Sequence, residues 1–381
     1  MSNDIQRKTD IIRSESVPIK NKQRNGTIDL LRLYFTIAVV MAHMISLFFQ
    51  ENSMRMPLRN GHISVEFFFV VSGYLMSTAC NKKRSESGQS TGYATYLFFR
   101  HKMQTLYPIW LLACFISLLL YFTNHRFSIA EIWKTLPAFL MISNLGFLDA
   151  HNIPWGWYIP TMLLAMAILF PLGYRFRSTF FYWMAPLIAL FTAVFLFQRN
   201  GKIMALQEEW LILIYPQTIR ALCGLCLGCC AWTIKERLNT WDGKLTIMGT
   251  TILSLFELAL WSVPIFGLLG IVSAYMHLPF MLCFMAGTAL AFSNLTWQGK
   301  IIRGSFFSWI GRISYAIYLA QFLSKELTPR WVDPTNTGLF IATYLVVSVG
   351  GGIALYYLAK TLSFLCKNIM IRAKSLLVRN I

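Results

Sequence analysis

The chain has 381 residues, of which 56% are hydrophobic and only 13% are charged, and its formal net charge is +18. Soluble globular domains carry about 25% charged residues, so this composition excludes an ordinary soluble protein. The apolar residues come in blocks of roughly 18–22, the length that crosses a hydrocarbon core about 30 Å thick. We therefore predict an all-α, polytopic integral membrane protein with about ten transmembrane helices.

The membrane domain is predicted to occupy residues 28–358, between basic tails at 1–27 and 359–381. Because the first tail is polar, the first apolar block is expected to serve as an uncleaved signal and anchor. The sequence shows no convincing internal repeat of the kind found in many transporters. The predicted spans are 28–49, 62–80, 104–122, 155–173, 180–197, 211–231, 245–263, 273–292, 308–324 and 338–358.

Two further apolar stretches fit this scheme less simply. Residues 131–148 contain Glu131, Lys134 and Pro137, so we predict an interfacial or re-entrant segment there, with a full span as the alternative. The run at 264–272 is compatible with a merger into the eighth helix.

The distribution of basic residues predicts the orientation. Of the 34 Lys and Arg residues, 23 lie in the tails and alternate loops, eight lie in the other loops, and three lie inside predicted helices. Cytoplasmic loops hold the excess of Lys and Arg in membrane proteins, so both termini are predicted to be cytoplasmic. This distribution also explains the high net charge without a nucleic-acid partner, which we do not expect.

The first predicted helix carries three ionisable residues, Asp29, Arg32 and His43. Such residues are costly inside a membrane and are therefore functional candidates. Arg32 and His43 are 11 residues apart, about three helical turns plus 20°, so they share one face at a separation of about 16 Å. Asp29 precedes Arg32 by one turn and is placed to pair with it. The alternatives are that Arg32 snorkels to the membrane edge and that His43 is only an interhelical hydrogen-bonder.

The second predicted helix carries Glu66, about one turn below the outer surface and at a depth similar to that of His43. A short loop joins the two helices, so they are expected to be neighbours. We therefore predict a His43–Glu66 pair, in which the carboxylate orients the imidazole as a general base for a hydroxyl. The alternative for Glu66 is a packing or gating role.

Five stretches, in order between residues 28 and 319, resemble motifs of the acyltransferase family 3 membrane proteins. The first is Ile28-Asp29-Leu30-Leu31-Arg32, followed by His43 after ten intervening residues. The second is the Val-Glu-Phe-Phe-Phe-Val-Val-Ser-Gly-Tyr-Leu stretch at 65–75. The later three are weaker signals when taken alone. They are Leu106-Tyr107-Pro108, Trp157-Tyr158-Ile159 and Gly311-Arg312-Ile313-Ser314-Tyr315-Ala316-Ile317-Tyr318-Leu319.

The resemblance implies a bacterial cytoplasmic-membrane enzyme that moves an acyl group, usually acetyl from acetyl-CoA, to a hydroxyl of a cell-surface or lipid-linked carbohydrate. Acetyl-CoA is then a co-substrate, membrane lipid and carbohydrate are the other partners, and no bound cofactor or metal is expected. The implied roles are catalytic for Arg32, His43 and Glu66, donor-binding for Arg100, Lys102 and Arg312, acceptor-binding for Trp157 and Tyr158, and supporting for Asp29, Ser72, Gly73 and Tyr74.

The chain departs from the family pattern at three informative positions. Glu66 stands where Asp is common, which keeps the carboxylate. The basic pair before the third helix aligns with Lys102 and Thr105, so one charge is missing from a segment implicated in donor binding. Gln321 stands where a His often follows the Ser-Tyr motif.

Other functions and sites are compatible with parts of the sequence. A transporter or flippase for a lipid-linked saccharide is the alternative function, and an inactive interaction protein is a third. Ser72 and Ser314 are weak candidate nucleophiles, because hydroxyls in membrane helices usually bond a backbone carbonyl. Arg220 either faces the cavity or pairs with a carbonyl, and the sequence leaves both open.

The cysteines of the sixth predicted helix have a spacing that resembles a metal site, at Cys223, Cys226 and Cys229–Cys230. Gly224 and Gly228 are interleaved with them in a small-xxx-small pattern, which is typical of close helix packing in membranes. The thiols also fall on more than one helix face. We therefore predict a packing surface and no metal.

Overall fold

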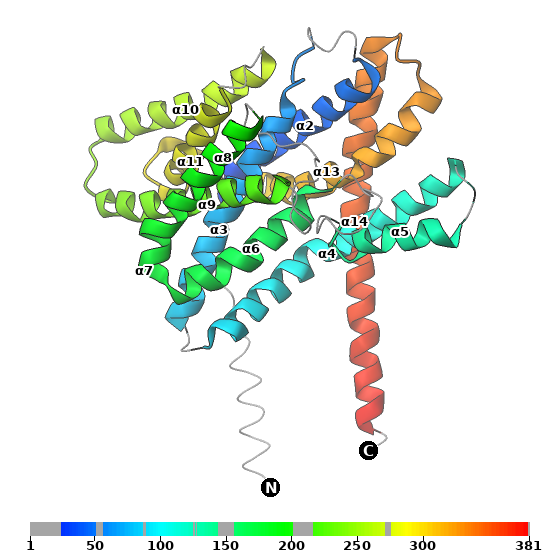
Figure 1. Ribbon diagram of the computed structural model, residues 1–381, viewed down its shortest axis with the longest axis horizontal. Helices are drawn as coiled ribbons and strands as arrows, with labels where there is room; N and C mark the ends of the chain where they lie inside the picture. Colours follow the sequence, from blue (N-terminus) through cyan, green and yellow to red (C-terminus); the bar gives the residue numbers. More distant parts are fainter. Residues whose placement is uncertain are drawn as a thin grey trace.

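The computed structural model describes residues 24–50, 56–86, 89–124, 126, 128–143, 156–200, 216–270 and 276–379. Within these ranges the protein is built from helices, and they contain no strand. Ten long helices follow the predicted spans in chain order (Figure 1). They are α2 (Gly26–Phe48), α3 (Ser64–Glu86), α4 (Thr91–Asn124), α6 (Tyr158–Arg175), α8 (Ala185–Asn200), α9 (Pro216–Leu238), α10 (Ile247–Leu269), α11 (His277–Ser293), α13 (Ser305–Trp331) and α14 (Thr337–Arg379).

Short elements connect or extend these helices. The 3₁₀ helix η2 precedes α3, and α7 and the π-helical turn η3 lead into α8. The 3₁₀ helix η4 follows α9, and α12 precedes α13. Their bounds are η2 (Gly61–Ile63), α5 (Ile129–Phe139), α7 (Arg177–Thr179), η3 (Phe180–Met184), η4 (Asn239–Trp241) and α12 (Trp297–Ile301).

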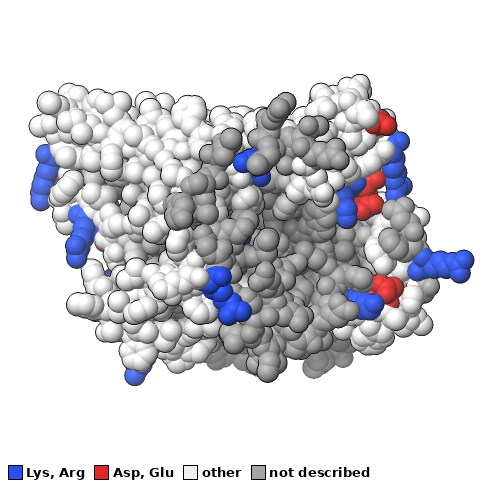
Figure 2. Space-filling view, turned by 45° about the horizontal axis from the view of Figure 1, so that its top comes forward, with Lys and Arg blue, Asp and Glu red and all other residues white. Residues whose placement is uncertain are grey.

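The length and apolarity of the helices confirm a polytopic membrane protein. Eight helical segments of the described chain are long and apolar enough to cross a membrane, and α11 is a shorter apolar helix. The 27 residues of α13 also suffice, at about 1.5 Å per residue, although polar side chains that point inward lower its hydropathy. Large apolar side chains such as Phe191, Leu255 and Val346 face outward, and uncharged residues dominate the visible surface (Figure 2).

The apolar stretch at 131–148 forms α5 and a turn, while residues 144–148 lie outside the described ranges. Eleven residues of α5 rise only about 16 Å, too little for a full span. The helix runs back beside α4 (Figure 1), and the Trp110 indole donates to the Ala138 carbonyl at 2.8 Å. Because Trp110 lies well inside the α4 span, this contact favours the re-entrant alternative.

Two other boundaries differ from expectation. The apolar run that begins at Pro264 continues α10 to Leu269, so its described part belongs to the seventh long helix and does not merge with the eighth. The helix α4 begins at Thr91, 13 residues before the predicted start at 104, which places Arg100 and Lys102 on a helix rather than in a loop.

The helices α3 and α9 are the most enclosed of the long helices and pack closely against each other. A side chain at Gly73 would overlap the Leu225 carbonyl, and one at Gly228 would overlap the Val70 carbonyl. Gly224 packs on the side chain of Phe69. These contacts confirm the packing surface predicted for α9, because only glycine lets the two backbones approach so closely.

Gly228→Ala is expected to destabilise the protein, because the added methyl group meets main-chain atoms that move only if α3 and α9 separate. Overpacking of this kind costs about 1–3 kcal/mol. The matched control is Gly350→Ala in α14, where a methyl group has open space and alanine favours the helix. Thermal unfolding in detergent compares the two variants, and equal melting temperatures would contradict the packing role.

Candidate active site

A cavity of about 380 Å³ lies between α2, α3, α4, α6, α13 and α14. Each of these helices except α14 carries one of the five sequence motifs described above. The cavity has two kinds of lining. Basic side chains gather on it from α2, α4 and α13, whereas apolar side chains and hydroxyls make up most of the remainder.

The stripe of α2 that carries the predicted pair faces the interior. Arg32, Thr36 and Val39 line the cavity at helical spacing, and His43 continues the stripe one turn further. The His43 Nδ1 atom lies 2.6 Å from the Gln321 Oε1 atom of α13. Arg32 and His43 therefore both point into the protein, as their shared face predicted.

Asp29 holds two arginines at the basic end of the cavity. Arg24 donates to both carboxylate oxygens, from Nε at 2.8 Å and from Nη2 at 2.6 Å. Arg32 donates from Nη1 at 3.1 Å, which confirms the predicted Asp29–Arg32 pair. Asn25 caps the helix by accepting from the Ile28 amide, which fixes where α2 begins. The cavity therefore has cations at this end in excess of the single carboxylate.

Sequence reasoning missed Arg24, which it placed in the basic tail. The available signal was its position next to a helix-capping Asn25, five residues before the buried Asp29. Lys102 and Arg312 also line the cavity, as the donor-site prediction requires. Together with Arg32, they bring positive charge to the cavity from three different helices.

The third residue of the predicted donor site is placed differently. Arg100 is exposed and is not among the residues that line the cavity. It precedes Lys102 by two positions on α4, and two helical steps turn a side chain by about 200°. Lys102 therefore faces the cavity, packed over the Phe98 ring at 5.7 Å, while Arg100 points away.

A glycine joins the first motif to the last. Any side chain at Gly311 would overlap the Asp29 Oδ1 atom, so the carboxylate occupies the space that a Cβ atom would need. The neighbouring Ser314 hydroxyl donates to the Gly311 carbonyl at 3.1 Å. Ser314 therefore makes the backbone bond expected of a hydroxyl in a membrane helix.

The second and fourth motifs meet through two hydroxyls. The Ser72 Oγ atom lies 3.1 Å from the Tyr158 hydroxyl, and both residues line the cavity. The Tyr318 ring stands edge-on to the Tyr158 ring at 6.4 Å. The Tyr315 hydroxyl donates to the Leu106 carbonyl of the third motif at 3.3 Å. All five motifs therefore converge on one cavity.

The other predicted support and acceptor residues lie behind this lining. Gly73 packs against α9, and the Tyr74 ring stacks on the Phe292 ring at 4.1 Å. Trp157 is half-buried with the Arg220 guanidinium 5.4 Å from its ring centre. Trp157 is not among the cavity-lining residues, so the two predicted acceptor residues face different surroundings.

The predicted His43–Glu66 pair is wrong. The Glu66 Oε1 atom accepts a hydrogen bond from the Arg220 Nε atom, and its Oε2 atom has no hydrogen-bond partner in the described structure. The reason is the face of α3 on which Glu66 lies. Val65 and Ser72 face the cavity, whereas Glu66 lies about 100° around the helix, on the face that packs against α9.

Of the two alternatives for Arg220, the structure supports pairing with a carbonyl, because Arg220 is not among the residues that line the cavity. It bonds the Glu66 carboxylate and also donates from Nη2 to the His62 carbonyl at 3.2 Å. Both side chains of the Glu66–Arg220 pair are almost fully buried, at 4% and 3% exposed. The pair links α3 to α9 at the same interface as the glycine contacts.

Arg220→Met alone is expected to lower the free energy of unfolding by about 3–5 kcal/mol, because it leaves the Glu66 charge buried and unpaired. The double variant Glu66→Leu with Arg220→Met should recover most of that loss, since no buried charge remains. Thermal unfolding in detergent measures both. A double variant no more stable than Arg220→Met would contradict this account of the pair.

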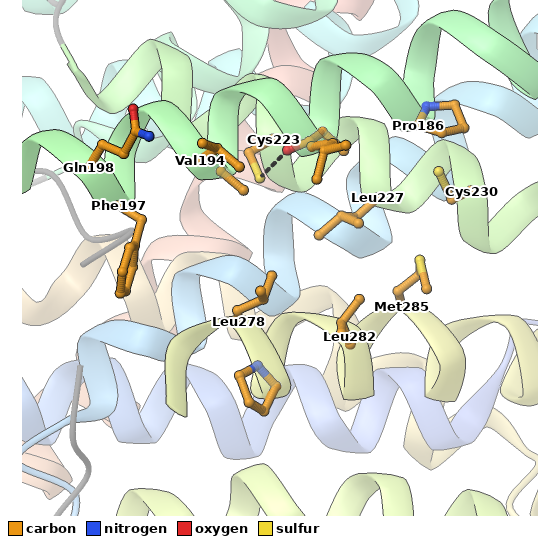
Figure 3. A pocket seen from close by; sticks show the side chains of 14 residues that line it. Pro186, Val194, Phe197, Gln198, Cys223, Leu227, Cys230, Leu278, Leu282 and Met285 are labelled. Carbon is orange, nitrogen blue, oxygen red and sulfur yellow. Dashed lines mark hydrogen bonds between the residues drawn. The ribbon is translucent and has the colours of Figure 1, made fainter. Parts of the chain in front are cut away.

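A larger hollow of about 860 Å³ lies between α8, α9 and α11 (Figure 3). Apolar side chains line most of it, together with Cys223 and Cys230, and Gln198 lies at one end. The Cys223 thiol donates to the Ala189 carbonyl at 3.5 Å. No charged side chain is among its described lining residues, so this hollow offers nothing to bind phosphate or to activate a hydroxyl.

Comparison with known proteins gives one family and no individual relative. A family model described as an acyltransferase domain, that of acyltransferase family 3, matches residues 25–357. No curated protein and no solved structure matches the chain. The matched region runs from the residue that caps α2 to a position within α14 and includes all five motifs. The chain therefore belongs to acyltransferase family 3 and is a membrane acyltransferase.

Proposed function

We propose that the protein transfers an acyl group, acetyl foremost, from acyl-CoA to a hydroxyl of a cell-surface or lipid-linked carbohydrate. The observation that carries this proposal is the α2 stripe, which has Arg32 at the basic end of the cavity and an inward-facing His43 about 16 Å along the helix axis. One end suits an anionic donor, and the other suits proton transfer.

The basic end fits the phosphates of coenzyme A. Arg24, Arg32, Lys102 and Arg312 border one cavity, with Asp29 as the carboxylate between the first two. Guanidinium groups bind phosphate as forked donors and an ammonium group binds it as a point charge. The apolar lining beyond this end suits the donor's flexible arm, which carries the thioester away from the phosphates.

The orientation supports the same assignment. The excess of basic residues in alternate loops predicts that this end of the cavity lies on the cytoplasmic side, where acyl-CoA is made. His43, one turn beyond the cavity-lining Val39, then lies toward the outer side, where a surface carbohydrate is exposed. We propose the bacterial cytoplasmic membrane as its location, which is what membership of this family implies.

Gln321 takes the orienting role first assigned to Glu66. An amide oxygen only accepts, so the Nδ1 atom of His43 carries the proton in the contact with Gln321 Oε1, and Nε2 is the basic nitrogen. His43 removes the proton of the acceptor hydroxyl as its oxygen attacks the thioester carbonyl carbon. The carbon–sulfur bond then breaks, and the same proton passes to the leaving thiolate, which gives the ester and free CoA.

His43→Ala is expected to lower the rate of acyl transfer by about 10²–10⁴-fold, which is the usual contribution of a general base. Membranes that contain the protein are supplied with radiolabelled acetyl-CoA, and CoA release and label in the acceptor are measured. A variant with the wild-type rate would remove His43 from the mechanism. Uptake of an unmodified saccharide without CoA release would instead identify a transporter.

Lys102→Leu is expected to raise the KM for acetyl-CoA about tenfold or more, because a hydrogen bond to a charged group contributes about 1.5–3 kcal/mol. The KM for S-acetylpantetheine, which lacks the nucleotide and its phosphates, should stay unchanged. Lys244→Leu, at an exposed position, is the matched control. An equal effect of Lys102→Leu on both donors would contradict phosphate binding at this end.

A further inference from the structure

Tyr158 is held rigidly in the wall of the cavity. It is the first residue of α6 and is 8% exposed. Its ring packs on the Phe69 ring at 4.8 Å and against the Tyr318 ring at 6.4 Å. Tyr158 and Arg32 both line the cavity. The hydroxyl group therefore has a fixed position beside the donor end of the cavity.

The hydrogen bonds of this hydroxyl fix where its proton lies. The Tyr158 hydroxyl donates to the Met162 Sδ atom at 3.2 Å, and a thioether only accepts. A phenol has one proton, so the contact with Ser72 Oγ at 3.1 Å is one in which Ser72 donates to Tyr158. The hydrogen bonds therefore run from Ser72 to Tyr158 and from Tyr158 to Met162.

The acceptor at the end of this series of hydrogen bonds differs from the acceptors of nearby hydroxyls. Ser77 donates to the Gly73 carbonyl at 2.9 Å, and Tyr315 donates to the Leu106 carbonyl at 3.3 Å. Those protons are bound to strong acceptors. The Tyr158 hydroxyl instead donates to a thioether sulfur, which is a weak acceptor. Rotating this O–H group toward a ligand oxygen therefore costs little free energy. A donating Ser72 also polarises the phenol and strengthens the bond it makes.

We propose that Tyr158, supported by Ser72, donates the hydrogen bond that stabilises the oxyanion of the acyl-transfer reaction. This inference rests on the proposed function. When the acceptor oxygen bonds to the thioester carbon, the carbonyl π electrons move to its oxygen, and the acceptor proton moves to His43. The Tyr158 O–H group donates to that oxyanion. As the carbonyl re-forms, the carbon–sulfur bond breaks, and the thiolate takes the proton from His43.

The expected role differs from the acceptor binding that the sequence indicated for Tyr158. A donor to the oxyanion acts on the chemical step, so its loss lowers kcat with little change in KM for the acceptor. Ser72 is a positioning residue, because it acts through Tyr158. Its loss should have the smaller effect, and the two losses together should be less than additive.

The first experiment measures CoA release from acetyl-CoA in membranes containing each variant. Tyr158→Phe is expected to lower kcat about 10²–10³-fold, the usual effect of losing one oxyanion donor. Tyr174→Phe, in the same helix and with its hydroxyl bonded to the Gln89 carbonyl, should match the wild type, as should Ser77→Ala. A Tyr158→Phe rate within about threefold of the wild type, or a raised acceptor KM at unchanged kcat, would overturn the inference.

A binding experiment keeps this inference separate from the proposed function. The wild type should bind acetyl-CoA more tightly than S-ethyl-CoA, which lacks the carbonyl oxygen, and Tyr158→Phe should lose that preference. If the wild type shows the preference but releases no CoA, the proposed function fails while the carbonyl contact stands. A preference that Tyr158→Phe retains, or an acetyl group found on Ser72 by mass spectrometry, would overturn the inference.

Discussion

The contact between Asp29 and its two arginines governs the arrangement of the cavity. The carboxylate is 2% exposed and receives bonds from Arg24 and Arg32, while Gly311 of α13 leaves room for it. An isolated carboxylate or guanidinium at this depth would be costly, so each group depends on the others for its place. The first helix is thereby fixed against α13 at one end.

A second contact fixes the same two helices further along. His43 of α2 meets Gln321 of α13, and both helices pass from the Asp29–Gly311 contact to this one in the same chain direction. The two contacts set the register between α2 and α13, and the cavity lies beside the segment between them. The basic end and the imidazole are therefore parts of one rigid pair of helices.

The features of the fold and the site that could be predicted are those that depend on the spacing of residues within one helix. The order of the helices followed from block length, and the Asp29–Arg32 pair and the shared face of Arg32 and His43 followed from helical spacing. The partner of Glu66 could not be predicted, because it depends on which helix packs against each face of α3. Local spacing gives the angle between Val65 and Glu66, but it does not tell which of them faces the cavity.

The remaining errors have similar causes. Arg100 and Lys102 were given the same role because the predicted start of the third helix was too late and left both residues in a loop. On a helix, side chains two positions apart point in nearly opposite directions. Tyr158 was predicted to bind the acceptor, since nothing in the sequence indicates that its hydroxyl donates to Met162. Contacts between distant helices determined each of these outcomes.

The length of α14 has a consequence for how its last part stays folded. Its 43 residues rise about 65 Å, roughly twice the hydrocarbon thickness, and fitting them within the bilayer would require a tilt of about 60°, well beyond the usual range. Figure 1 shows the helix projecting past its neighbours, and residues 361–367 are exposed. A helix in water must ordinarily form its first turn at a cost. In α14 the membrane-embedded turns are already formed, so the projecting segment only has to extend an existing helix.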